Sequence, residues 1–330
     1  MSNRKLGAFE CASIGLGCMN LSHAYGTPPS EKEAEQLLLS ALDMGYNMLD
    51  TAALYGFGNN EVLLGKVLKQ RRNEFVLASK CGMFKNDAGV REINGRPDVI
   101  RKTCEDSLGR LQTDVIDLYY LHRWDRNVPI EESVGALSDL VTEGKVRGVG
   151  LSEVSADTLR KAHAVHPISA VQTEYSLWTR NPEIAVLDTC RELGAAFVAF
   201  SPLARAYLTG KLRDIYALTE KDLRRDMPRF EVDNYARNLL LLDSIEEVAE
   251  QENCTLAQLA LAWVLAQGEH VIAIPGTTNL NHLKENFSAK DVFLSADVIA
   301  RLDKIINQDT VVGARYNALT QAEIDTEEVA

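Results

Sequence analysis

The chain has 330 residues, of which 46% are hydrophobic and 25% are charged, a composition typical of a soluble globular protein. Its net charge of −12 argues against nucleic acid as a partner, because binding to phosphate backbones needs a basic surface. The N-terminal residues lack the apolar core of a signal peptide, and no apolar run approaches the ~20 residues of a membrane span. The six scattered cysteines include no C-x-x-C pair. We therefore expect a cytoplasmic protein with no metal site and no membrane partner.

Short apolar runs alternate along the chain with segments of helical periodicity. Strands are predicted at 13–17, 46–50, 75–80, 115–122, 146–152, 169–175, 196–202 and 271–276. Helices are predicted at 29–45, 96–111, 130–145 and 181–194, within the long connection 203–270 (including a buried core helix at 255–267), and as an extra helix at 295–307 before a C-terminal tail.

Alternation of strands and helices indicates parallel strands joined by right-handed crossovers. Eight such units predict a closed (β/α)8 barrel that forms a single domain over residues 1–330. The rival is an open, doubly wound sheet, which normally shows a G-x-G-x-x-G sequence after its first strand. The candidate stretches "GLGCMN" and "GVGLSE" both lack the third glycine, and this favours the barrel.

Ionisable residues stand at the ends of three consecutive predicted strands. Asp50 ends the second strand, Lys80 the third and His122 the fourth, and Tyr55 lies in the loop after Asp50. Taken singly, each is more typical of a turn cap, a surface charge or a structural histidine. Because the active site of such a barrel lies at the carboxyl ends of its strands, we expect all four to converge there.

The four residues together suit protonation of an oxygen atom. Lys80 next to the Tyr55 hydroxyl is expected to favour the phenolate and to lower the tyrosine pKa from its usual ~10. Asp50 is expected to pair with Lys80 and hold it charged, and His122 to orient a carbonyl oxygen. Tyr55 would then act as a general acid near neutral pH. The set contains no nucleophile–base pair for acyl transfer.

At these residues the sequence resembles the aldo-keto reductases, which are NAD(P)H-dependent (β/α)8 barrels with an Asp, Tyr, Lys and His tetrad. The resemblance runs in order from residue 3 to about 310, and one of its phrases is most similar to the auxin-induced and pyridoxal-reductase branch. The matching phrases are "LDTAALYGFGNNEVLLGKVL", "LYYLHRWD", "GKVRGVGLSE", "VQTEYSLWTR" (the phrase that indicates the branch), "FSPLARAYLTGK" and "IPGTTNLNHLKEN".

The resemblance implies an NADPH-dependent carbonyl reductase and assigns residues to the cofactor. Glu153 departs from the family pattern, since many members have Asn where it stands. The implied cofactor-binding residues are Asp50, Ser152 and Gln172 (the last two at the nicotinamide carboxamide), Phe200 stacked on the nicotinamide ring, Ser201, Leu203 and Arg205 at the pyrophosphate, and Gly276, Thr277, Thr278, His282, Glu285 and Asn286 at the adenosine phosphate.

The cofactor preference is less marked than in many members of the family. Those members hold the 2′-phosphate with a Lys after the "IP" of the last strand and an Arg six residues later, whereas this chain has Gly276 and His282. Backbone N–H groups at a helix start still favour an anion, and no acidic residue in "GTTNLNH" repels it. We expect NADPH to be preferred over NADH by a modest margin that grows toward pH 6, where histidines gain charge.

The substrate is expected to be a flat, partly apolar carbonyl compound held between the loops that follow the strands. Candidate pocket residues are Asn20, Tyr25, Met83, Trp124 and Trp178. Two other functions stay open: a lyase that forms a Schiff base on Lys80, and a regulatory module that binds cofactor without turnover, as in channel β-subunits of this family. The sequence names neither the substrate nor the oligomeric state.

Overall fold

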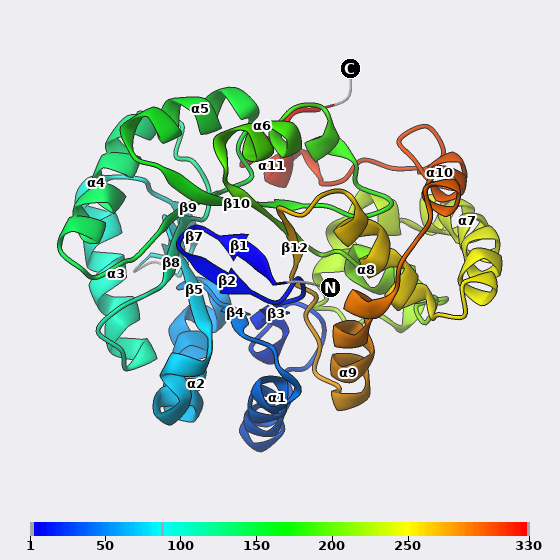
Figure 1. Ribbon diagram of the computed structural model, residues 1–330, viewed down its shortest axis with the longest axis horizontal. Coiled ribbons are helices and arrows are strands. Elements are labelled where there is room, and N and C mark those ends of the chain that lie inside the picture. The colour runs from blue at the N-terminus through cyan, green and yellow to red at the C-terminus, as the bar shows by residue number, and fades with distance from the viewer. Residues whose placement is uncertain (1–2, 87–88, 329–330) are drawn as a thin grey trace.

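Eight parallel strands form a closed barrel in the computed structural model, which describes residues 3–86 and 89–328 (Figure 1). The barrel is closed where Ile14 pairs with Ala273 in parallel and the Gly15 N–H donates to the Ala273 carbonyl at 2.9 Å. This confirms the predicted barrel against the open sheet. The barrel strands are β3 (Leu16–Gly17), β4 (Met48–Asp50), β5 (Val76–Cys81), β8 (Leu118–Leu121), β9 (Val149–Ser152), β10 (Ile168–Glu174), β11 (Ala196–Phe200) and β12 (Val271–Ala273).

Helices surround the barrel, and their ends follow from local sequence (Figure 1). Ser30 caps α1 in a reciprocal capping box with Glu33, and Gly45 ends the helix with φ 99°. Thr255 and Gln258 form the same box at α8, which is buried nearly all round, as predicted. The helices are α1 (Glu31–Met44), α2 (Asn59–Leu68), α3 (Pro97–Leu111), α4 (Ile130–Thr142), α5 (Ala156–Val165), α6 (Val186–Leu193), α7 (Val232–Gln251), α8 (Leu256–Ala266), α9 (Leu280–Ser288), α10 (Ala296–Ile305) and α11 (Ala318–Gln321).

Two antiparallel hairpins lie outside the eight units and are not predicted from the sequence. The first joins β1 (Arg4–Leu6) to β2 (Phe9–Cys11) and lies across one end of the barrel in Figure 1. Leu6 and Cys11 pack with the side chains that fill the barrel interior, so this end is closed. The second hairpin, β6 (Met83–Lys85) with β7 (Arg91–Ile93), follows the third barrel strand. Because the β1–β2 hairpin closes one end of the barrel, a ligand must enter at the opposite end, which we call the mouth.

The C-terminal segment after α10, residues 313–328, returns to the mouth. The Arg315 guanidinium forms an ion pair with Glu153, and the Asp325 carboxylate accepts hydrogen bonds from the Ser155 N–H at 3.0 Å and the Thr158 hydroxyl at 2.6 Å. The segment thus covers part of one face, in agreement with the prediction of a tail over the barrel. No helix in the described part of the chain is both long and apolar enough to cross a membrane.

Candidate active site

The three strand-end residues singled out in the sequence, together with Tyr55, meet at the mouth. Asp50 is the last residue of β4, Lys80 lies near the end of β5, and His122 follows β8 directly. Tyr55 begins a 3-10 turn after β4, and its ring centroid lies 5.8 Å from that of His122 at an edge-on angle of 83°. The structure therefore brings all four side chains into one site.

Lys80 is the centre of a buried hydrogen-bond network. Its ammonium forms an ion pair with Asp50 and donates to the Tyr55 hydroxyl at 3.1 Å and to the Thr51 carbonyl at 2.9 Å. Gln172 donates to the second oxygen of Asp50 at 2.7 Å. An ammonium has three donors, and these three acceptors use all of them. The orientation of Lys80 toward Tyr55 is therefore fixed.

The loop that carries Tyr55 is held by left-handed backbone and by a buried amide. Gly56, Phe57 and Gly58 all have positive φ, which turns the chain from the strand end into α2 within three residues. The Asn60 side chain accepts from the Thr51 hydroxyl at 2.6 Å and donates to the Cys18 carbonyl at 2.9 Å. This explains the "GFGNN" sequence, and it places the Tyr55 hydroxyl rigidly.

Burial, rather than Lys80, decides the pKa of Tyr55. Burial raises this pKa above its usual value, and the Lys80 cation opposes the rise without cancelling it. The sequence-based expectation of a lowered tyrosine pKa is therefore wrong, because it left out desolvation of the phenolate. Burial by itself lowers the pKa of Lys80, but Asp50 and Tyr55 outweigh it and the pKa is raised. At neutral pH Tyr55 is a protonated donor next to a charged lysine.

His122 is neutral in this environment. Burial holds its pKa well below the usual value, and the nearby Arg123 and Lys80 cations lower it further. Its buried Nδ1 has no hydrogen-bond partner among the described residues. The expectation left the charge of His122 open, and the structure favours a neutral ring that can donate one hydrogen bond toward a carbonyl oxygen.

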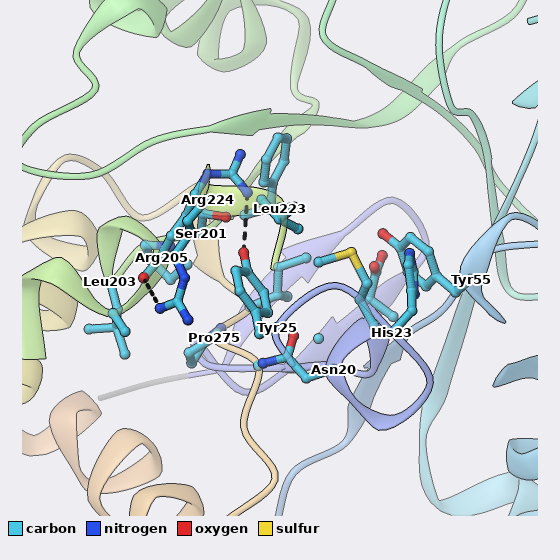
Figure 2. A pocket seen from close by; sticks show the side chains of 18 of the residues that line it. Asn20, His23, Tyr25, Tyr55, Ser201, Leu203, Arg205, Leu223, Arg224 and Pro275 are labelled. Atoms are coloured by element: carbon cyan, nitrogen blue, oxygen red, sulfur yellow. Dashed lines mark hydrogen bonds between the residues drawn. The ribbon is translucent and has the colours of Figure 1, made fainter. Parts of the chain in front are cut away.

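A cavity of about 630 Å³ opens beside the tetrad (Figure 2). In Figure 2, Tyr55 and His23 lie on one side, Leu203 and Arg205 on the other, and Tyr25 and Asn20 between them. Every cofactor-binding residue expected from the family resemblance lines this cavity. These residues are Asp50, Ser152, Gln172, Phe200, Ser201, Leu203, Arg205, Gly276, Thr277, Thr278, His282, Glu285 and Asn286.

Close backbone approach shapes the part of the cavity between β3 and the chain after β12. A Cβ on Gly17 would lie 2.8 Å from the Ile274 carbonyl, and a Cβ on Gly276 would lie 2.9 Å from the Gly17 carbonyl. Beyond Gly276, the Asn279 side chain caps α9 by accepting from the N–H groups of Asn281 and His282. The cap uses two of the helix N–H groups, so the side chains at this end carry more of any anion binding.

Arg205 is held by partners of its own at the cavity wall. It donates to the Glu174 carboxylate at 2.7 Å and to the hydroxyls of Tyr25 and Tyr316, each at 3.1 Å. Arg205 and its neighbour Ala206 both have left-handed backbone, which costs free energy in non-glycine residues and is found most often at functional sites. Arg205 therefore lines the cavity as part of an ion pair.

Three of the five expected substrate residues line the cavity, namely Asn20, Tyr25 and Met83. Trp124 and Trp178 do not line it, which corrects the prediction for both. Trp178 is buried and stacks on Tyr207, with ring centroids 4.2 Å apart. Trp124 donates to the Val128 carbonyl within its own loop. Both indoles stabilise loops at the mouth.

Several cavity residues were missed in the sequence. His23 lies with its ring centroid 5.7 Å from that of Tyr55, and Arg123 follows His122. Arg224 and Tyr316 come from the long connection and the C-terminal segment. Only Arg123 had a sequence signal, its place next to a strand-end histidine. Glu153, noted for replacing an Asn, is absent from the cavity wall and forms its ion pair with Arg315.

A model of the Aldo/keto reductase family matches residues 13–307. The chain belongs to this family. It is 44% identical to the Schizosaccharomyces pombe aldo-keto reductase yakc, whose name carries the mark NADP(+), over 95% of this chain and 94% of that protein. It is also 44% identical to probable aldo-keto reductase 1 of Glycine max, over 94% of this chain and 91% of that protein.

Solved structures resemble this aldo/keto reductase in the same way. The glycerol dehydrogenase of Gluconobacter oxydans superposes with a TM-score of 0.83 at 30% identity, covering 92% of this chain and 94% of that one. A Klebsiella pneumoniae aldo/keto reductase in complex with NADP and acetate gives 0.73 at 27% identity, covering 96% and 99%. The predictions of the family, the barrel and an oxidoreductase are thereby confirmed.

Proposed function

We propose that this aldo/keto reductase is an NADPH-dependent carbonyl reductase that converts aldehydes or ketones to alcohols, with Tyr55 as the general acid. The observation that carries the proposal is the position of the Lys80 ammonium between the Asp50 carboxylate and the Tyr55 hydroxyl, directly behind the wall of a cavity that Asp50, Tyr55 and His122 line. This arrangement protonates an oxygen atom and offers no nucleophile for acyl transfer.

NADPH fits the residues that line the cavity. Phe200 at the end of β11 offers an aromatic face, and Ser152 and Gln172 offer polar groups from the neighbouring strands β9 and β10. The mark NADP(+) on the fission yeast relative and the NADP in the Klebsiella complex support the same choice. A bound reduced nicotinamide supplies the hydride that the protein itself lacks.

The chain's own residues supply the proton and the orientation. A carbonyl oxygen placed between Tyr55 and His122 accepts hydrogen bonds from a protonated phenol and a neutral imidazole. As negative charge develops on that oxygen, Tyr55 transfers its proton. The Lys80 cation then stabilises the phenolate that remains, and Asp50 keeps Lys80 charged. Stabilisation that appears only as charge develops lowers the barrier rather than merely improving binding.

The decisive variant is Tyr55→Phe, which removes the acid and keeps the ring. With a panel of aldehydes and ketones and NADPH absorbance as the readout, we expect turnover to fall by ~100-fold or more. The dissociation constant for NADPH, measured by fluorescence quenching, should hardly change. Turnover close to that of the wild type would reject Tyr55 as the acid.

The two other functions find less support in the geometry. A Schiff-base lyase needs an uncharged lysine within reach of substrate, whereas Lys80 is fully buried, lies behind the cavity wall and has a raised pKa. If borohydride trapped no carbonyl compound on Lys80, the Schiff-base lyase would be rejected. A regulatory module would bind NADPH and reduce nothing, so the same carbonyl panel tests it. No disulfide joins the six cysteines, and we propose a cytoplasmic location on this basis.

A further inference from the structure

Arginines in the cavity wall differ in whether they have a counter-ion. Three of them are paired: Arg91 with Glu323, Arg205 with Glu174 at 2.7 Å, and Arg224 with Asp222 at 2.7 Å. Arg123 forms no ion pair with any described residue and is only 9% exposed. Lys211, the remaining cavity cation without an ion pair, lies at an exposed position where water solvates its charge. Among the cations that line the cavity, Arg123 is therefore the buried one without an ion-pair partner in the described part of the chain.

The contacts of Arg123 use only part of its guanidinium. Its Nη1 donates to the His122 carbonyl at 2.6 Å and to the Ser152 hydroxyl at 3.2 Å. Its buried Nε has no partner among the described residues, and no hydrogen bond from Nη2 is found there either. A guanidinium has five donors in a planar fork that matches a carboxylate, so most of its capacity is unused.

The neighbouring carboxylates are already neutralised by other cations. Both oxygens of Glu153 accept hydrogen bonds from Arg315, and Glu153 also accepts from the Thr326 hydroxyl at 2.6 Å. Glu174 accepts from Arg205 at 2.7 Å and from Arg315 at 3.3 Å. Two carboxylates therefore face the guanidiniums of Arg205 and Arg315, and Arg229 also lies close enough to act on Glu174. Arg123 acts on Glu153 as well, so the positive charges of this cluster outnumber its carboxylates. A buried charge without a partner is costly, and this favours a ligand that supplies one.

We propose that Arg123 binds a carboxylate carried by the substrate, so that the preferred carbonyl compounds are oxo acids or aldehydes with a carboxylate close to the carbonyl group. The carboxylate and the carbonyl group of the substrate should be close together, because Arg123 follows His122 in the chain and donates to its carbonyl oxygen, and His122 lies next to Tyr55. This inference rests on the proposed carbonyl reduction and names the substrate class for it. It makes Arg123 a specificity-determining residue.

The test compares 2-, 3- and 4-carboxybenzaldehyde with their methyl esters as substrates for the full-length enzyme and NADPH. Each pair has the same aldehyde and nearly the same shape, and differs in charge. We expect kcat/KM for at least one acid to exceed that for its ester by roughly 10-fold, in line with a hydrogen-bonded charge pair. Arg123→Met should abolish this acid-to-ester ratio, and Arg123→Lys should retain part of it.

Lys211→Met is the control, because it removes another cavity cation without leaving a carboxylate unpaired, and it should keep the ratio. A wild-type ratio near one for all three isomers would overturn the proposal. Equal losses for acid and ester in Arg123→Met would reassign Arg123 to positioning of His122. A weakened NADPH dissociation constant would reassign it to the cofactor. If the wild type oxidised NADPH with neither acids nor esters, the proposed carbonyl reduction itself would fail.

Discussion

The Nζ of Lys80 lies 3.1 Å from the hydroxyl oxygen of Tyr55 and is held there by its ion pair with Asp50. A lysine in this position does not make the tyrosine acidic in the resting site, since burial still raises the tyrosine pKa. In the mechanism that we propose, its effect is on the phenolate that forms after proton transfer. Lys80 would then act on the transition state more than on the ground state.

Lys80→Met should abolish turnover while the barrel stays folded, because the methionine keeps much of the packing of the lysine stem. It should also lower the free energy of unfolding by about 3–5 kcal/mol, since Asp50 is left buried without its cation. Urea denaturation and steady-state kinetics measure the two effects. The double variant Lys80→Met/Asp50→Asn should regain stability but not activity. Wild-type rates in either variant at neutral pH would contradict this role.

The pH dependence of carbonyl reduction should be flat across the neutral range. Burial raises the pKa of Tyr55 above the usual ~10 of tyrosine, and the acid is active below its pKa. The pKa of His122 is well below 6.5, so His122 does not change charge there. We expect kcat/KM to be level from pH 6 to about 9 and to fall only in more alkaline solution. An ionisation near pH 7 would count against these assignments, and the residual rate of Tyr55→Phe should lack the alkaline decline.

Glu174 should contribute to stability in a pH-dependent way. Burial alone raises its pKa, but Arg205 and Arg315 outweigh burial and lower it from 4.5 to about 2. A lowered carboxyl pKa stabilises the folded state above pH ~4.5, and this contribution is lost as the pH falls toward 2. Its size is about 3 kcal/mol at neutral pH.

Glu174→Gln should therefore lower the free energy of unfolding at pH 7, and the deficit should shrink between pH 4.5 and 3. Guanidinium denaturation at pH 7, 4 and 3 measures it. Glu246→Gln is the control, since Glu246 is half exposed and pairs with Arg213 on the surface. That change should cost less than ~1 kcal/mol at every pH. A deficit for Glu174→Gln that is independent of pH would argue for lost packing instead.

His282 should tune the choice between NADPH and NADH. It lines the cavity in the first turn of α9, where the family resemblance implies the adenosine phosphate. His282→Glu should reduce the preference for NADPH by roughly 10-fold, because a carboxylate there would repel the 2′-phosphate, and His282→Lys should increase it. Asn281→Glu makes the same charge change one residue away, outside the cavity wall, and should have little effect. The preference is measured as the ratio of the dissociation constants for NADH and NADPH in the wild type and in each variant.

The tetrad was predictable because strand periodicity and the barrel rule place Asp50, Lys80 and His122 at one end, whatever the loops do. Strand periodicity located all eight strands, although β3, β4, β8, β9, β11 and β12 are shorter than expected. It did not find the β1–β2 hairpin, since strands of three residues carry almost no periodicity. The rival open sheet was excluded by missing glycines, and the closure at Ile14 confirms that reasoning.

The errors share a physical cause, which is that side-chain environment depends on residues distant in sequence. Trp178 packs on Tyr207 instead of facing the cavity. Glu153 finds its partner Arg315 162 residues further along the chain. The direction of the pKa shift of Tyr55 depended on burial, which no local pattern reports. Local sequence thus predicted where the functional groups are attached, and tertiary packing decided their charge and their partners.

The ion pairs of Arg315 can form at the mouth only after this late part of the chain has been synthesised. Glu153 and Glu174 leave the ribosome long before Arg315, and the barrel itself closes only when Ala273 can pair with Ile14. A nascent chain that ends within the long connection therefore has an open sheet edge and two carboxylates without this counter-ion. An open edge of this kind is exposed to pairing with other chains. The barrel can consequently close only after Ala273 has been made, and the residues of the C-terminal segment that line the cavity are added last.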